Sequence, residues 1–249
     1  MSRRVLILGG GSAIAFAYAR VRAAEGCTVV LAGRRADLLE ANAADLKARG
    51  AAGAEVVAGD LADAAALPAL AQRLFAAEAY PDEVLIAYGS LPDQDAAAAD
   101  LSQARAALEV NLVSPALWLL ALMQARPAGR PLSVAVIGSV AGDRGRGSNF
   151  IYGAAKGGLA RLVEGLQHAN AGAKEVSITL VKPGFTLTPM TQGVPGRGGP
   201  LWATPDAVGA AIAKAVDKAR PEIYAPGFWR LIMLLIRHLP RMVFNRMKI

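Results

Sequence analysis

The sequence predicts one α/β domain with a doubly wound parallel sheet of about seven strands, followed by an amphipathic helical tail at the C-terminus. Three observations support this fold class. Short apolar runs alternate with longer alanine-rich stretches of helical pattern, the 249 residues suffice for a single large core, and 54% of the residues are hydrophobic, as strands covered on both faces require. We expect strands at residues 4–8, 28–32, 54–58, 83–88, 132–138, 176–181 and 222–225. The domain is expected over residues 1–227 and the tail over residues 228–249.

A glycine cluster follows the first predicted strand. Residues 4–8 lead into Gly9-Gly10-Gly11-Ser12, and a helical pattern then runs from Ala13 to Ala24. Glycines let the backbone approach a pyrophosphate closely, and a helix N-terminus offers unpaired N–H groups and a favourable dipole. This order is typical of the opening of a Rossmann-type dinucleotide-binding fold. A tight turn alone would also use these glycines, so the motif needs support from the rest of the chain.

Tyr152 and Lys156 lie four residues apart in a predicted helix, and Ser139 ends an apolar run upstream of them. Residues at this spacing share one helix face, so the Lys156 ammonium is expected close to the Tyr152 phenol. A fixed cation favours the phenolate and lowers its pKa from the usual value near ~10. A tyrosine of this kind can exchange a proton with a carbonyl oxygen. The pair alone also arises by chance, so it is informative only with its neighbours.

Several motifs together resemble the short-chain dehydrogenase/reductases in order and spacing, over essentially the whole chain. They comprise Gly9, Asp60, Leu61, Asn111, Ser139, Tyr152, Lys156, Pro183, Gly184 and Thr188. The resemblance implies that Tyr152 is the general acid/base and that Lys156 lowers its pKa and holds the nicotinamide ribose. It also implies that Ser139 orients the carbonyl and that Asn111 holds a water in a proton relay. The implied cofactor-binding residues are Gly9, Gly11, Ser12, Ala13, Ile14, Arg34, Asp60, Leu61, Ala87, Tyr88, Gly89, Tyr152, Lys156, Pro183, Gly184, Thr186 and Thr188.

The chain departs from the family pattern at two places. Ala13 and Ala15 replace the second and third glycines of the usual Thr-Gly-x-x-x-Gly-x-Gly motif, and Ala87-Tyr88-Gly89 replaces the usual Asn-Ala-Gly. An added methyl group at each glycine position is expected to separate helix and cofactor slightly.

Charge at the end of the second strand indicates the cofactor. A site selective for NAD places an acidic residue on the ribose 2′-hydroxyl, whereas this chain has Gly33 followed by Arg34 and Arg35. The missing acid and the present cations favour a 2′-phosphate, so we predict NADPH, with NADH as the alternative. In the alternative interpretation, the two arginines are solvated charges at a helix start.

Composition limits the other function classes. One cysteine, Cys27, permits no internal disulfide and suits a reducing cytoplasm. His168 and His238 lie far apart and form no metal-ligand motif, so no metal is expected. No segment is expected to span a bilayer. The formal net charge is +7, but no nucleic-acid motif accompanies it, so no nucleic-acid partner is expected.

Two loops are expected to border the substrate in this family. Residues 143–147 read Asp-Arg-Gly-Arg-Gly, and residues 193–200 are rich in glycine and proline. Their arginines, Arg144, Arg146 and Arg197, suit a phosphate or another anion, although surface arginines often bind nothing.

The tail combines cations with apolar residues. Residues 228–249 contain no acidic residue and five cations, namely Arg230, Arg237, Arg241, Arg246 and Lys248. The spacing of four of them, all except Arg246, places them along one side of a helix, with Trp229, Leu231, Ile232, Leu235, Val243 and Phe244 elsewhere on its surface. This pattern favours a helix lying in an anionic membrane interface and broken at Pro240. In the alternative, the tail packs in the interface of a homodimer or homotetramer.

The segment from Ser139 to Gly153, together with residues 237–241, resembles the decaprenylphosphoryl-2-keto-erythro-pentose reductases. The resemblance implies an NAD(P)H-dependent reductase of a keto-sugar linked to a polyprenyl phosphate, in cell-envelope glycan synthesis. Such an enzyme is expected in the cytoplasm, peripheral on the inner face of the membrane. The alternative is a cytosolic reductase of a small ketone or acyl substrate. A cofactor-binding regulatory protein is disfavoured by the complete set of predicted catalytic residues.

Overall fold

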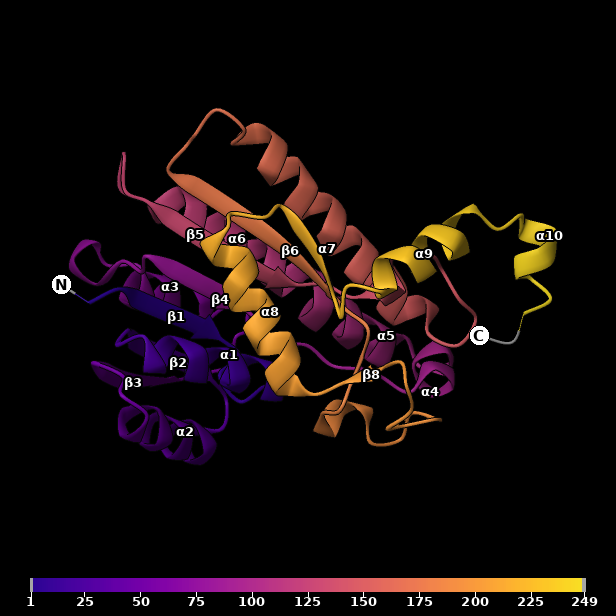
Figure 1. Ribbon diagram of the computed structural model, residues 1–249, viewed down its shortest axis with the longest axis horizontal. Helices are drawn as coiled ribbons and strands as arrows, with labels where there is room; N and C mark the ends of the chain where they lie inside the picture. Colours follow the sequence, from indigo (N-terminus) through magenta and orange to yellow (C-terminus); the bar gives the residue numbers. More distant parts are fainter. Residues whose placement is uncertain (1, 248–249) are drawn as a thin grey trace.

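The computed structural model describes residues 2–247, which form a three-layer α/β structure (Figure 1). Its central sheet has seven parallel strands in the order β3-β2-β1-β4-β5-β6-β9. These strands are β1 (Arg4–Leu8), β2 (Thr28–Gly33), β3 (Gly53–Ala58), β4 (Glu83–Ile86), β5 (Leu132–Ile137), β6 (Val176–Pro183) and β9 (Glu222–Ala225). The strand order reverses direction between β1 and β4, which in such sheets is where ligands bind, at the carboxyl ends of the strands.

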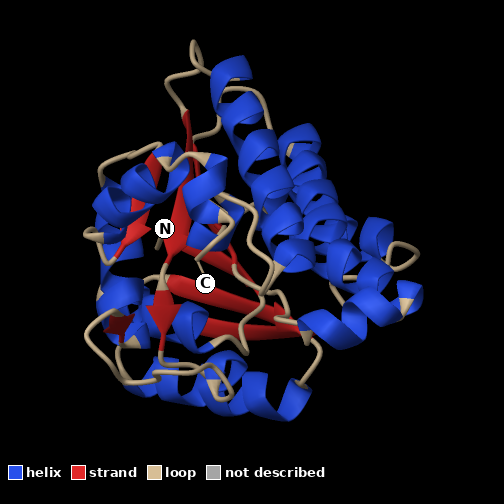
Figure 2. Cartoon of the chain, turned by 90° about the vertical axis from the view of Figure 1, so that its right-hand side faces the viewer, coloured by secondary structure: helices blue, strands red, loops and turns tan. Residues whose placement is uncertain are grey.

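Helices cover both faces of the sheet (Figure 2). One face carries α1 (Ala13–Ala24), α2 (Ala36–Ala48) and α8 (Pro205–Asp217), and the other carries α3 (Leu67–Leu74), α6 (Ser114–Ala125) and α7 (Phe150–Ala169). Each face has its own apolar core, because parallel strands buried on both sides present apolar residues in both directions. The remaining helices are α4 (Gln94–Ala99), α5 (Leu101–Leu108), α9 (Trp229–His238) and α10 (Arg241–Phe244).

The predicted strands and the predicted first helix agree closely with the structure. β4 is shorter than expected, because residues after Ile86 leave the ladder and turn into the site at the switch point. β6 is longer, because its last residues pair with β9 up to Pro183 and Ala225. The small ribbon of β7 (Phe185–Thr186) and β8 (Trp202–Ala203) was not expected from the sequence. Two-residue strands are too short to show an alternating apolar pattern in the sequence. The Phe185 ring stacks on Trp202 across the pair, with 5.1 Å between ring centroids.

One helical stretch departs from expectation in length and hydropathy. Leu101–Ala125 is continuous through α5, the π-turn η2 (Glu109–Val113) and α6. An 18-residue window within it has a mean hydropathy of 1.7, which would suffice for a membrane span by composition. It packs instead against the sheet: Trp118 and Leu119 lie fully buried in the core between α3, α7 and the strands. The stretch therefore belongs to the helical layer of the domain.

The tail forms two helices separated at Pro240, as predicted, and α10 lies beyond α9 at the margin of the molecule (Figure 1). The expectation that Trp229 lies on the tail surface is wrong: Trp229 and Met233 are buried against Val140, with Phe185 and Ile232 packed alongside. The exposed large apolar residues of the tail are Phe228, Leu231, Leu234, Leu235, Met242, Val243 and Met247. The break also divides the predicted basic stripe between two helices, and Lys248 lies outside the described residues.

Candidate active site

A cavity of about 440 Å³ opens at the carboxyl ends of the central strands. All predicted catalytic and cofactor-binding residues line it, together with residues that the sequence did not single out. Turns after β1, β4, β5 and β6 contribute Gly9, Tyr88, Ser139 and Gly184, and helix α7 contributes Tyr152 and Lys156. The topology therefore brings residues from most of the chain to a single site at the switch point.

Lys156 is buried in the floor of this cavity. Its Nζ donates a hydrogen bond to the Ile137 carbonyl at 3.0 Å and lies 5.9 Å from the centroid of the Tyr152 ring. Ser139 begins the 3-10 turn after β5, and its Oγ accepts from the Ala141 N–H. Tyr152, Lys156 and Ser139 thus face the same space from two elements that pack together.

The ionisation of this group differs from the sequence-based expectation. Burial raises the pKa of the Tyr152 phenol, with the Ser139 hydroxyl acting in the opposite direction. Burial also lowers the pKa of Lys156 to about 8. The Lys156 ammonium does not outweigh the effect of burial on the pKa of Tyr152, because it bonds a backbone carbonyl and lies 5.9 Å from the ring centroid. Tyr152 is consequently a neutral phenol near pH 7, which is the form that can give up a proton.

Asn111 lies in the π-turn η2, where the helix locally accommodates an extra residue. The side chain is fully buried; Nδ2 donates to the carbonyls of Ser90 and Ala107 at 2.9 Å, and Oδ1 accepts from the Ser90 N–H. These bonds fix Asn111 against the turn after β4. A Cβ placed on Gly89 would lie 2.7 Å from Asn111 Oδ1 and 3.6 Å from Lys156 Nζ, so only glycine fits between the two side chains.

The residues around the first glycine turn fit a dinucleotide. Gly9 has φ +99°, and a Cβ there would lie 2.6 Å from the Tyr88 nitrogen, so glycine is required by both conformation and space. Ala13 and Ile14 line the cavity in the first turn of α1, where backbone N–H groups have no acceptor within the helix. Ser12 caps this helix by accepting from the Ala15 N–H. An anionic pyrophosphate is the kind of ligand such a turn attracts.

The arginines after β2 also lie at this cavity. Arg34 and Arg35 both line it, and the Arg35 guanidinium is 3.5 Å from the Gly11 carbonyl oxygen. Of the two alanines that replace family glycines in α1, Ala13 lines the cavity, whereas Ala15 is buried in the core. Tyr88 is anchored by a 2.7 Å hydrogen bond between its hydroxyl and Ser114.

Sequence reasoning missed several residues that shape the site. Gln94 accepts a hydrogen bond from the Ile151 N–H and so holds the start of α7 next to Tyr152. Trp229 lies so close to Gly184 that any Cβ on Gly184 would overlap its indole ring. No local sequence signal marks these contacts, since the partners are far apart in the chain. The other lining residues that were not singled out are Leu39, Ala62, Val110, Ile137, Gly138, Pro189, Met190 and Thr191.

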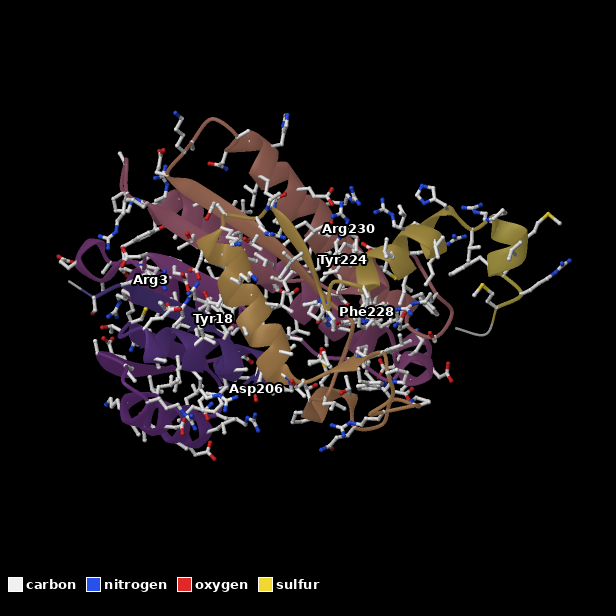
Figure 3. All side chains as sticks on the ribbon, in the orientation of Figure 1. Arg3, Tyr18, Asp206, Tyr224, Phe228 and Arg230 are labelled. Atoms are coloured by element: carbon white, nitrogen blue, oxygen red, sulfur yellow. The ribbon has the colours of Figure 1, made fainter. Side chains whose placement is uncertain are left out.

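The two predicted substrate loops differ in how their charges are used. Asp143 binds Lys182 at 2.9 Å and accepts from Tyr224 at 2.7 Å. Figure 3 labels Tyr224 near Arg230, at the start of α9. Arg144 donates to the carbonyls of Ile236 and Leu239 and stacks on Phe244. Arg197 donates to the Thr188 carbonyl. Arg146 has no such partner within residues 2–247.

Comparisons with known proteins identify the class. The family model described as short chain dehydrogenase matches residues 3–196. An uncharacterized oxidoreductase of Mycobacterium tuberculosis (strain ATCC 25618 / H37Rv) is 38% identical, covering 98% of this chain and 96% of that protein. An uncharacterized oxidoreductase of Streptomyces coelicolor is 36% identical over the same shares.

Solved structures share the fold. A 3-oxoacyl-[acyl-carrier protein] reductase from Brucella melitensis, solved with NAD, gives a TM-score of 0.79 at 24% identity, covering 93% of this chain and 98% of that one. A putative NAD(P)-dependent gluconate 5-dehydrogenase from Beutenbergia cavernae, solved with NADP, gives 0.80 at 26% identity, covering 92% and 97%. This chain belongs to the short-chain dehydrogenase family. It is an oxidoreductase that uses a nicotinamide cofactor.

Proposed function

We propose that this protein is an NADPH-dependent reductase of a ketone carbonyl, with Tyr152 as the proton donor. The observation that supports it best is the buried cluster of Tyr152, Lys156 and Ser139 at the switch-point cavity. The nicotinamide supplies the hydride to the carbonyl carbon. Tyr152 gives its phenolic proton to the carbonyl oxygen, and the Ser139 hydroxyl donates a hydrogen bond to the same oxygen. The Tyr152 phenol, whose pKa is raised by burial, carries the proton that reduction requires.

Lys156 and Asn111 support this step. In this proposal, the Lys156 ammonium holds a ribose hydroxyl, and its positive charge near the ring stabilises the Tyr152 phenolate that proton transfer leaves. Asn111 fixes the turn that carries Gly89 beside Lys156. Arg34 and Arg35 line the cavity just after β2, and a guanidinium there would have a charged, bidentate partner in a 2′-phosphate, which supports NADPH over NADH.

The substrate we propose is a keto-sugar carried on a polyprenyl phosphate, reduced at a membrane surface inside the cell. The tail supports this choice: Leu231, Leu234 and Leu235 are exposed on α9, and Arg230 and Arg237 are exposed on the same helix. Residues 228–249 contain no acid to repel anionic lipid. Exposed leucines and unopposed cations suit a helix that lies in the interface. The second candidate is a reductase of a small ketone, with the same leucines covered in a homodimer or homotetramer.

Charge substitutions on α9 test the choice without removing the buried part of the tail. Deleting residues 228–249 would remove Trp229 and Met233 from the core, so it would confuse unfolding with loss of membrane contact. Leu231 and Leu235 are 66% and 70% exposed, so the pair Leu231→Glu and Leu235→Glu should fold normally. Leu101→Glu on α5 is the matched control, because Leu101 is 85% exposed and lies far from the tail in sequence.

Flotation with anionic liposomes at low salt gives the readout. Wild type and the Leu101→Glu control should float, the tail variant should remain at the bottom, and added salt should release the wild type. Turnover of a polyprenyl-phosphoryl keto-pentose in liposomes should fall in the tail variant, while turnover of a short water-soluble ketone should not. Two results together would instead support the small-ketone reductase. The wild type would not float with liposomes, and the tail variant would sediment with a lower mass than the wild-type oligomer.

A further inference from the structure

Arg146 is a partly buried cation that differs from two fully buried cations of the described chain, Arg22 and Lys182, in having no acidic partner. Arg22 pairs with Glu83 at 2.6 Å, and Lys182 pairs with Asp143 and Glu222. The Arg146 side chain has no acidic partner within residues 2–247, and its Nε is buried without a hydrogen-bond partner. An unpaired buried guanidinium N–H is costly unless a ligand satisfies it.

Arg146 lines a second pocket, separate from the cofactor cavity. Residues 145–148 form one wall, and Phe244, Asn245 and Met247 from the end of the tail form the other. The loop of the first wall lies between Ser139 and Tyr152, and Arg144 holds it to the tail by donating to the Leu239 carbonyl at 2.8 Å. The pocket therefore joins the active-site loop to the tail.

The second pocket is lined by one basic side chain, by polar side chains and by apolar side chains. It contains no Asp or Glu, and the nearest acid in the loop, Asp143, is already bound to Lys182 and Tyr224. Ser148 and Asn245 add hydrogen-bonding groups, while Phe244 and Met247 add an apolar side. A Cβ on Gly145 or Gly147 would meet no atom within 4 Å, so the loop backbone is open to an approaching group.

We propose that this pocket binds a phosphate ester carried on an apolar chain, with Arg146 as the anion ligand. The guanidinium pairs with the phosphate oxygens, and the chain leaves along Phe244 and Met247. The phosphate belongs either to the lipid-linked substrate or to a membrane headgroup. The first case deepens the proposed function, because it places the substrate phosphate beside the loop that precedes Tyr152.

Calorimetric titration of the full chain with farnesyl phosphate, without cofactor or carbonyl substrate, tests the site. Farnesol and inorganic phosphate serve as probes of the two halves of the ligand and should each bind more weakly. Arg146→Gln should weaken farnesyl phosphate roughly ten- to a hundredfold, as expected for loss of a charge-assisted hydrogen bond. Arg220→Gln removes the same charge from an exposed site before β9 and should leave the affinity unchanged. Unchanged thermal midpoints should show that both variants are folded.

Flotation of the same variants distinguishes the two sources. If the phosphate is that of the substrate, Arg146→Gln floats with phosphatidylglycerol vesicles like the wild type; if it is a headgroup, flotation falls as well. Farnesyl phosphate affinity unaffected by Arg146→Gln would overturn the proposal in both forms. The titration does not depend on turnover, so the two proposals can fail separately. A wild type that binds farnesyl phosphate but does not oxidise NADPH with any ketone would count against the reductase and still support the phosphate site.

Discussion

Lys156 shows how one buried side chain links stability to chemistry. It is 3% exposed, its only described hydrogen bond is to the Ile137 carbonyl, and burial lowers its pKa from 10.5 to about 8. The unfolded chain therefore holds this proton more tightly than the folded one. A buried cation whose pKa is lowered by desolvation is typical of a functional site.

Lys156→Met should stabilise the cofactor-free protein near pH 7. The folded pKa lies below the unfolded one, so the penalty is complete below about pH 8 and disappears as pH rises toward 10.5. Each pKa unit corresponds to 1.36 kcal/mol, so the lowering from 10.5 to about 8 corresponds to a gain of at most about 3 to 4 kcal/mol, from which the lost hydrogen bond subtracts. Urea denaturation of both proteins at pH 7 and pH 10 measures it. A variant less stable than wild type at pH 7 would contradict the account.

Arg34→Ala should weaken NADPH roughly ten- to a hundredfold and leave NADH nearly unchanged. Only the 2′-phosphate gives the guanidinium a charged, bidentate partner. Fluorescence titration with both cofactors measures this change, with Arg73→Ala, an exposed arginine on α3, as the control. Equal affinity of the wild type for NADH and NADPH would remove the basis of the proposed preference.

At the scale of elements, the start of α9 and the turn after β6 support each other. Trp229 packs over Gly184, and its ring lies 5.4 Å from that of Phe185, which in turn stacks on Trp202 of β8. Gly184 also lines the cofactor cavity. The start of the tail therefore packs against a residue of the active-site wall, and the proposed boundary at residue 227 separates segments that pack together.

Trp229→Ala should cost about 3 to 5 kcal/mol of unfolding free energy, as for other buried aromatic residues, and should weaken cofactor binding. Phe228→Ala is the matched control, because its ring is adjacent but exposed, and it should cost less than about 1 kcal/mol. Denaturation midpoints and cofactor titrations measure both effects. Equal losses in the two variants would mean that Trp229 has no special role in this wall.

At the scale of the whole molecule, the sequence predicted the features that repeat or obey local rules. Apolar runs and glycine turns located the strands, and the order of motifs placed seventeen predicted cofactor contacts and four catalytic residues, two of them shared, around a single cavity. The environment of individual groups was not predictable. Burial of Trp229 depends on Val140 and on the residues after β6, and the raised pKa of Tyr152 depends on desolvation. The unpaired Nε of Arg146 likewise depends on contacts that no local sequence pattern marks.

The central claim is that Tyr152 transfers the proton in a nicotinamide-dependent carbonyl reduction. Single-turnover reduction of a ketone by NADPH, compared between wild type and Tyr152→Phe, tests it most directly. The ring of the variant still packs but has no transferable proton, so the reduction rate should fall at least about a hundredfold while NADPH affinity stays within about twofold. A Tyr152→Phe enzyme that retains more than about a tenth of the wild-type rate would contradict the assignment.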